Sequence, residues 1–136
     1  MFVLRKILNS GTNVPESCRM ETTAGVSYQV GSALTLTSGK LTNATATDKP
    51  LYIAAESANA NEKSTLLCYP IYDNMIFEVP VTNPTSALIC GVKVTLGVVS
   101  GYAIKVTSTT TNGVATVVDR NGANRMGDTV YVKFEN

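Results

Sequence analysis

Short runs in which apolar and polar residues alternate with a period of two recur along this 136-residue chain. In residues 26–30 every second side chain is apolar, as in a strand that buries one face. Residues 30–42 then contain two apolar runs separated by Ser38-Gly39, where glycine permits the positive φ of a tight turn. The pattern predicts a strand that leads directly into a β-hairpin.

Further apolar runs bounded by turn-forming residues predict more short strands. They occupy residues 51–55, 64–71, 75–81, 92–98, 102–107, 114–119 and 129–135. Pro70 confines its strand to a sheet edge or a bend, because proline cannot donate a ladder hydrogen bond. At most two helical turns are expected, at 58–62 and 86–90. Short strands with frequent turns are typical of an all-β fold, either a small barrel or a sandwich.

Turn-forming dipeptides divide the second half of the chain into hairpins. Ser100-Gly101, Asn112-Gly113 and Asn121-Gly122 each separate two predicted strands, and asparagine and glycine both tolerate positive φ. We therefore expect a run of hairpins there. The stretch at residues 83–86 is the clearest interior break, so residues 26–136 are expected to form a single β-rich domain with a subdivision at that point.

The first 25 residues are expected to form an N-terminal arm. An apolar segment at its start is followed by the turn formers of residues 9–15, which separate it from the first predicted strand. This segment needs a partner that covers its side chains. It either adds a strand to the domain's own sheet, which the sequence favours, or pairs with another chain. Its apolar residues are Phe2, Val3, Leu4, Ile7 and Leu8.

Composition and charge narrow the classes of partner. Hydrophobic residues make up 44% of the chain, charged residues 15%, and the formal net charge is +1. Because the basic residues are scattered, with Arg5-Lys6 as the one adjacent pair, no nucleic-acid partner is expected. The N-terminal apolar run is too short for a membrane span or a secretory signal. We therefore expect no membrane partner and synthesis in the cytoplasm of the producing cell.

The residues that usually carry catalysis are sparse. The chain has no histidine, which removes the usual general base and the commonest metal ligand. Two carboxylate pairs, Asp73 with Glu78 and Asp119 with Asp128, bracket turns, where aspartate usually hydrogen-bonds its own backbone. No glycine-rich phosphate loop occurs. The sequence therefore indicates a binding surface with no catalytic residues, no cofactor and no metal.

The three cysteines are widely spaced and odd in number. They match neither a disulfide framework nor the spacing of a metal site, and we interpret Cys18, Cys68 and Cys90 as small buried apolar residues. Cys90 precedes a glycine and lies in a predicted turn, but no base is available that would activate it as a nucleophile.

Residues 30–42, followed by residues 49–54, resemble the hairpin-and-return pattern of the small head-decoration proteins of tailed bacteriophages, the lambda-like type included. Residues 74–78 are similar to the continuation of that pattern. The resemblance covers residues 26–82 and does not extend beyond Asn83, so the additional strands of the second half depart from it.

The resemblance implies a compact β-tulip domain that sits as a homotrimer on the outside of an expanded capsid, binds the major capsid protein and stabilises the virion. It also implies that the arm residues Phe2, Val3, Leu4, Ile7 and Leu8 pair with the capsid protein. Two alternatives remain open. One is another virion component, such as a tail-tube or head-fibre base protein, which would assemble by itself. The other is a small barrel that binds a ligand in an apolar pocket.

Overall fold

The computed structural model describes residues 1–135, and the regular elements of this part of the chain are all β-strands. Twelve strands lie in these residues: β1 (Val3–Ile7), β2 (Cys18–Glu21), β3 (Ala33–Thr37), β4 (Lys40–Asn43), β5 (Tyr52–Ala54), β6 (Thr65–Pro70), β7 (Met75–Pro80), β8 (Lys93–Val94), β9 (Leu96–Val99), β10 (Tyr102–Val106), β11 (Ala115–Asp119) and β12 (Thr129–Lys133). The predicted all-β fold class is confirmed.

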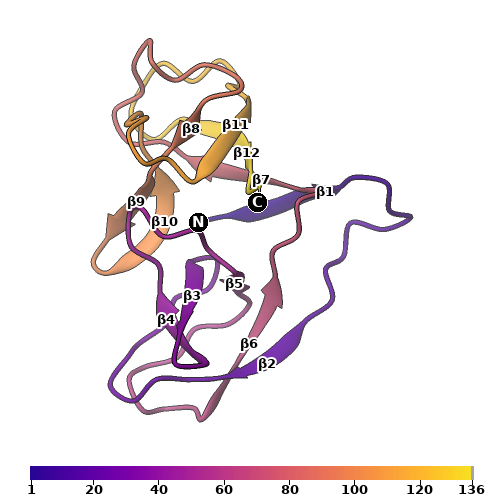
Figure 1. Ribbon diagram of the computed structural model, residues 1–136, viewed down its shortest axis with the longest axis vertical. Coiled ribbons are helices and arrows are strands. Elements are labelled where there is room, and N and C mark those ends of the chain that lie inside the picture. The colour runs from indigo at the N-terminus through magenta and orange to yellow at the C-terminus, as the bar shows by residue number, and fades with distance from the viewer. Residues whose placement is uncertain (136) are drawn as a thin grey trace.

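The strands form two antiparallel sheets. A five-stranded sheet has the order β1-β7-β12-β11-β8, and a seven-stranded sheet has the order β2-β6-β5-β3-β10-β9, with β4 paired to β3. Figure 1 shows the five-stranded sheet in the upper part of the molecule and strands β2 to β6 in the lower part. The fold is a small β-sandwich-like domain. Of the two predicted architectures, the sandwich is therefore the one observed, and a closed barrel is not formed because the strands are shared between two sheets.

The chain crosses between the sheets where a strand bends. β8 belongs to the five-stranded sheet and β9 to the seven-stranded sheet, and Thr95 is the single residue between them. Its hydroxyl lies 2.7 Å from that of Thr107, which satisfies both side chains at this nearly buried bend. β6 likewise ends at Pro70 before the chain enters β7 of the other sheet. Pro70 lies beyond the end of β2, so no residue of that strand requires a backbone N–H at this position.

Two apolar cores stabilise the domain. The first core includes Phe2, Phe77 and Phe134, whose ring centroids are 5.7 to 6.2 Å apart. Residues on both sides of the 83–86 segment contribute to it. The second core lies within the curled part of the seven-stranded sheet and is built around Leu34 and Leu66. The alternation predicted for β7 is confirmed, since every second side chain from Met75 onward is buried.

Three local predictions were wrong: the strand at 26–30, the hairpin at Asn112-Gly113, and the burial of Cys18 and Cys90, because Cys18 is partly exposed and Cys90 is exposed. Residues 26–30 do not form a strand, because only Tyr28 makes a bridge, to Ala58. The Asn112-Gly113 turn does not close a hairpin, because β10 and β11 lie in different sheets. Residues 58–62 and 86–90 contain single hydrogen-bonded turns and no helix, which agrees with the upper limit of two helical turns. For the segment 26–30 and the Asn112-Gly113 turn, pairing with distant parts of the chain decides a conformation that local sequence leaves ambiguous.

The N-terminal segment is built into the fold. β1 pairs with β7 along the edge of the five-stranded sheet, and the backbone N–H of Phe2 donates to the carbonyl oxygen of Gly31 at 2.8 Å. Further along, β2 pairs with β6. The apolar segment at the start of the chain therefore adds a strand to the domain's own sheet, as the sequence favoured.

Candidate functional site

The outer face of the five-stranded sheet, turned away from the first core, carries an open hollow of about 460 Å³. Its surface is mainly apolar, although it lies on the solvent side of the sheet. Strands β1, β7, β11 and β12 and the residue that follows β1 supply its lining: Arg5, Lys6, Leu8, Ile76, Val118, Asp119 and Tyr131. We call this feature the outer hollow.

Strand register explains why apolar side chains gather on this face. Ile76 lies between the inward-facing residues of β7, so its own side chain points outward. Tyr131 has the same phase in β12. In β11 the pairing shifts between Val117 and Asp119, and the extra residue, Val118, is 39% exposed while Val117 is buried. This β-bulge adds a valine to the outer face of the sheet.

Arg5, which lines the outer hollow, is already paired with Glu78. Arg5 Nε donates to one carboxylate oxygen of Glu78, and the Thr129 hydroxyl donates to the other, both at 2.8 Å. The hydrogen bond from Thr129, followed by that from Arg5, lowers the pKa of the Glu78 carboxyl below its ordinary value. The lining also carries Lys6 and Asp119, which are opposite in sign. The hollow is thus apolar with a balanced, mixed-charge border.

The five arm residues predicted to bind a partner have different environments in the structure. Phe2 is only 2% exposed and belongs to the first core, and Leu4 and Ile7 pack against that core. Val3 is opposite Glu78 in the ladder and shares its outer face. Leu8 lines the outer hollow. In this fold Phe2 is therefore inaccessible to a partner, whereas Leu8 is on the candidate surface.

Sequence reasoning did not identify the other residues that line the outer hollow. Two signals were present in the sequence: Ile76 occupies the polar phase of an alternating strand, and Val118 directly follows another valine in a strand. Neither signal shows that the two residues lie near each other, because β1, β7, β11 and β12 meet only through the sheet order.

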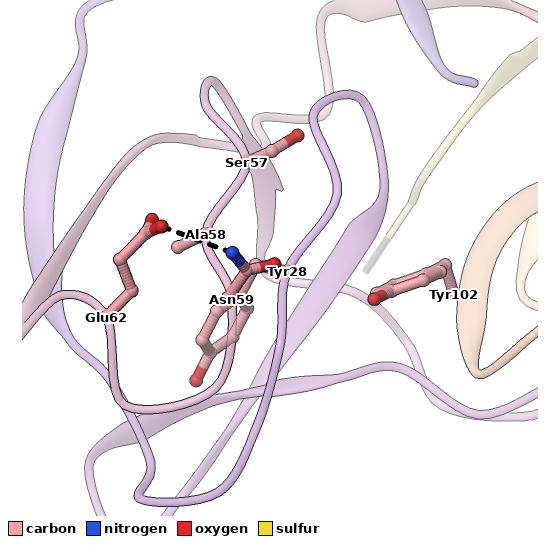
Figure 2. A pocket seen from close by; sticks show the side chains of 6 residues that line it. All are labelled: Tyr28, Ser57, Ala58, Asn59, Glu62 and Tyr102. Atoms are coloured by element: carbon pink, nitrogen blue, oxygen red, sulfur yellow. Dashed lines mark hydrogen bonds between the residues drawn. The ribbon is translucent and has the colours of Figure 1, made fainter.

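A second hollow, of about 210 Å³, lies near the 57–62 loop and is shown in Figure 2. Its two tyrosine hydroxyls are already engaged: that of Tyr28 donates to the Leu41 carbonyl oxygen at 2.6 Å, and that of Tyr102 lies 2.7 Å from the Ser27 hydroxyl. Its volume is below the range of about 300 to 1,000 Å³ that is usual for small-molecule sites. The predicted ligand-binding alternative therefore gains no support from this hollow.

Two of the four candidate catalytic carboxylates, Asp119 and Asp128, serve local backbone structure, whereas Glu78 is bound by the side chains of Arg5 and Thr129. Asp119 accepts a hydrogen bond from the N–H of Asn121, and Asp128 accepts from Asn124 and Arg125 in the same loop. Within residues 1–135 there is no group of three or more His, Cys, Asp or Glu side chains arranged to hold a metal ion. The described part of the chain also lacks a helix of the length and apolarity needed to cross a membrane.

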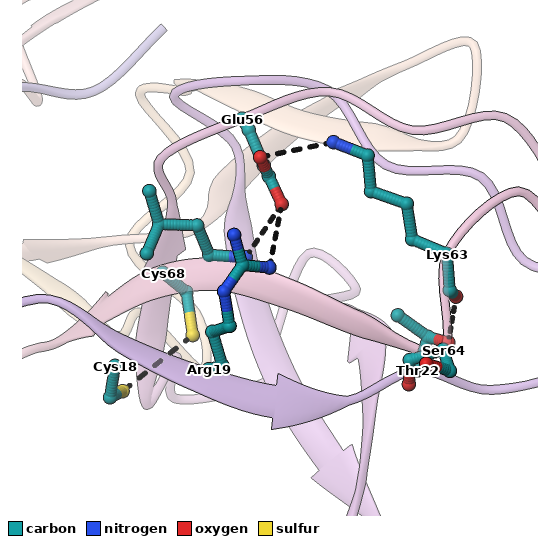
Figure 3. Close-up of polar contacts among 8 residues, drawn as sticks. Cys18, Arg19, Thr22, Glu56, Lys63, Ser64 and Cys68 are labelled. Atoms are coloured by element: carbon teal, nitrogen blue, oxygen red, sulfur yellow. Dashed lines mark hydrogen bonds and ion pairs between the residues drawn. The ribbon is translucent and has the colours of Figure 1, made fainter.

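A polar cluster holds the edge strand β2 against β6 and is shown in Figure 3. Glu56 accepts a hydrogen bond from the Leu67 backbone N–H at 2.9 Å and lies 3.0 Å from Lys63 and 3.5 Å from Arg19 of β2. The Leu67 hydrogen bond, then the Lys63 hydrogen bond, lowers the pKa of the Glu56 carboxyl. We interpret this cluster as a structural clasp.

Comparison with known proteins identifies no relative: no protein-family model, no curated protein and no solved structure matches this chain. The surface of the protein is therefore the basis for inferring its function. Of the features described above, the outer hollow is the one that combines exposed apolar area with an accessible shape.

Proposed function

We propose that this protein is a structural virion protein that binds the outer surface of an assembled phage shell and stabilises it, with the major capsid protein as its partner. The observation that carries the proposal is the outer hollow, an apolar depression on the solvent-facing side of the five-stranded sheet. The resemblance of residues 26–82 to head-decoration proteins supplies the identity of the partner.

The character of the hollow favours a protein partner. Burial of apolar area is the main source of free energy in protein association, and the centres of such interfaces are depleted in charge. The lining fits that pattern, since Leu8, Ile76 and Val118 are apolar while Arg5 is paired with Glu78. A weak contact of this kind resists disassembly of a shell when many symmetry-related copies make it together.

The placement of the arm gives the proposal a specific form. Because Phe2 is part of the core, β1 contributes to docking through its outer side, by Arg5, Lys6 and the following Leu8. We propose that three copies associate on the shell, as in the decoration proteins that the sequence resembles. The domain itself docks as a preformed unit, which avoids the entropic cost of ordering a free arm.

Co-sedimentation of the purified protein with expanded phage shells that lack it tests the proposal, with unexpanded shells as the control. Saturable binding to expanded shells, together with a higher shell melting temperature, is the expected result. Absence of binding to either kind of shell would overturn the proposal. Equal binding to both would contradict the preference for the expanded state.

A second candidate, a self-assembling component of a tail tube or fibre base, is favoured by one observation. β9 is an edge strand of the seven-stranded sheet, and its consecutive residues Val98 and Val99 are exposed. Exposed apolar edges are templates for strand pairing between chains. Formation of rings or filaments by the isolated protein at rising concentration would support this candidate over shell binding, and a monomeric or trimeric protein would refute it.

A further inference from the structure

We propose that Cys18 and Cys68 form an oxidisable dithiol that closes to an intramolecular disulfide by exchange with a small-molecule disulfide such as oxidised glutathione. We call the pair the β2–β6 dithiol. It lies in the second core, away from the residues of the outer hollow, and does not depend on the proposed function.

The geometry of the two strands brings the sulfur atoms together. Cys18 of β2 is directly opposite Cys68 of β6 in an antiparallel ladder, and the two Sγ atoms are 3.9 Å apart (Figure 3). Opposed residues in such ladders have Cα atoms about 4.5 to 5.5 Å apart, within the range of about 4.4 to 6.8 Å found for disulfides. Closure therefore needs side-chain rotation and little backbone movement.

The two thiols differ in exposure, which assigns them different roles. Cys18 is on the edge strand and is partly exposed, whereas Cys68 is 0% exposed on the inner strand. Burial, with a further contribution from Cys18, raises the pKa of the Cys68 thiol to about 12. Cys18 is consequently the thiol that meets a reagent from solvent, and Cys68 is the resolving thiol behind it.

The exchange runs in two balanced steps. The Cys18 thiolate attacks one sulfur of oxidised glutathione, which forms a protein–glutathione mixed disulfide and releases one glutathione thiolate. Cys68 then attacks the Cys18 sulfur, the Cys18–glutathione bond breaks, and the thiol proton of Cys68 passes to the departing second glutathione. The two cysteines are oxidised, and one oxidised glutathione is reduced to two glutathione molecules.

The surrounding contacts hold the pair in register. The clasp at Glu56 connects Arg19, the neighbour of Cys18, to the backbone of Leu67, the neighbour of Cys68. At the other end of β2 the Thr22 hydroxyl donates to the Lys63 carbonyl oxygen at 2.6 Å. Both contacts lie on the C-terminal side of Cys18, which is the first residue of β2, and they hold the strand in register with β6. The two sulfur atoms therefore stay close, so attack by Cys68 competes well with reversal of the mixed disulfide by free glutathione.

The experiment exposes the folded 136-residue protein to oxidised glutathione, quenches the reaction with acid, and measures intact mass and disulfide-linked peptides. A Cys90→Ala background removes the exposed third thiol. We expect loss of two hydrogens without a glutathione adduct, loss of both remaining thiols from the free-thiol count, and a higher thermal unfolding temperature that a reductant reverses.

Two matched variants in the same background separate the roles. Cys68→Ala should accumulate a stable glutathione adduct on Cys18, because no resolving thiol remains. Cys18→Ala should stay unmodified in the folded state, because Cys68 is buried. Persistence of the adduct when both cysteines are present, or a Cys18–Cys68 disulfide that appears only in denaturant, would overturn the proposal.

Discussion

Removal of the Phe2 side chain tests whether the start of the chain belongs to the core of the isolated protein. Phe2 is 2% exposed, and its ring packs edge-on against Phe77 at 6.2 Å and obliquely against Phe134 at 5.7 Å. Truncation of a fully buried phenylalanine to alanine typically costs about 3 to 5 kcal/mol, which includes the transfer free energy and the cavity left behind. We expect Phe2→Ala to lower the free energy of unfolding by this amount.

Equilibrium urea unfolding gives the change in free energy if the slope with denaturant is unchanged, and a shift in the unfolding temperature of about 10 to 17 °C should accompany it. Val3→Ala is the matched control on the same strand. Its side chain faces outward beside Glu78, so its cost should be about 1 kcal/mol or less.

Similar costs for Phe2→Ala and Val3→Ala would refute this reasoning. That result would mean that β1 is detached from β7 in the isolated protein and that Phe2 has no partner in the core. The arm would then be free to order on another chain, and docking would pass through the arm as well as through the outer hollow.

Three further predictions concern stability. The pKa of Glu78 is lowered in the folded state, so its ionised carboxylate contributes to the free energy of unfolding. This contribution is fully present above pH about 4.5 and is lost as the pH falls through the folded-state pKa. Glu78→Gln should therefore reduce the loss of unfolding free energy at acid pH, as measured by urea titration at several pH values. Gly113→Ala should lower the free energy of unfolding in urea by about 1 to 3 kcal/mol, because a Cβ there would overlap the Lys93 backbone. Gly11 has open space around it, so Gly11→Ala should change the free energy of unfolding by no more than about 0.5 kcal/mol. Closure of the β2–β6 dithiol should raise the free energy of unfolding by about 2 to 4 kcal/mol, compared by urea titration of oxidised and reduced protein. The first prediction is contradicted if Glu78→Gln leaves the pH dependence of stability unchanged, and the second if the two glycine variants are equally stable. The third is contradicted if the oxidised protein is no more stable than the reduced protein.

Local signals in the sequence were sufficient for the strands and for the tightest turns. Ser38-Gly39 and Ser100-Gly101 both have positive φ at each residue, as a two-residue hairpin requires, and each closes the hairpin that its sequence predicts. The strand at 75–80 was also predictable, because alternating burial leaves a pattern in residue type. The strand at 52–54 was predictable from its short apolar run, which follows Pro50.

The assignment of strands to sheets was not available from local signals. Asn112 has the expected positive φ, but Gly113 does not. A glycine is needed at position 113 because the Lys93 backbone passes close by. A turn that transfers the chain to another sheet has the same composition as a hairpin turn. Only the non-local pairing of β8 with β11 distinguishes the two, and that pairing leaves no periodicity in the sequence.

The candidate surface was unpredictable for the same reason. Its residues come from β1, β7, β11 and β12 and from the segment after β1, which are distant in sequence and meet through sheet order. The bulge in β11 adds a second difficulty, because it leaves the consecutive residues Val118 and Asp119 both exposed and so breaks the alternation within one strand. The sequence did indicate that the N-terminal segment needed a partner, and the structure supplies β7 as that partner.

Shell binding by a pair of matched lysine variants tests the central claim most directly. Val118→Lys places a charge in the outer hollow, and Val14→Lys makes the same change at an exposed valine outside it. Val118→Lys should bind expanded shells at least about tenfold more weakly than the unmodified protein, because an unpaired charge buried in an interface costs more than about 1.4 kcal/mol. Val14→Lys should bind as tightly as the unmodified protein. Equal binding of all three proteins, with both variants folded, would contradict the claim that the outer hollow is the docking surface.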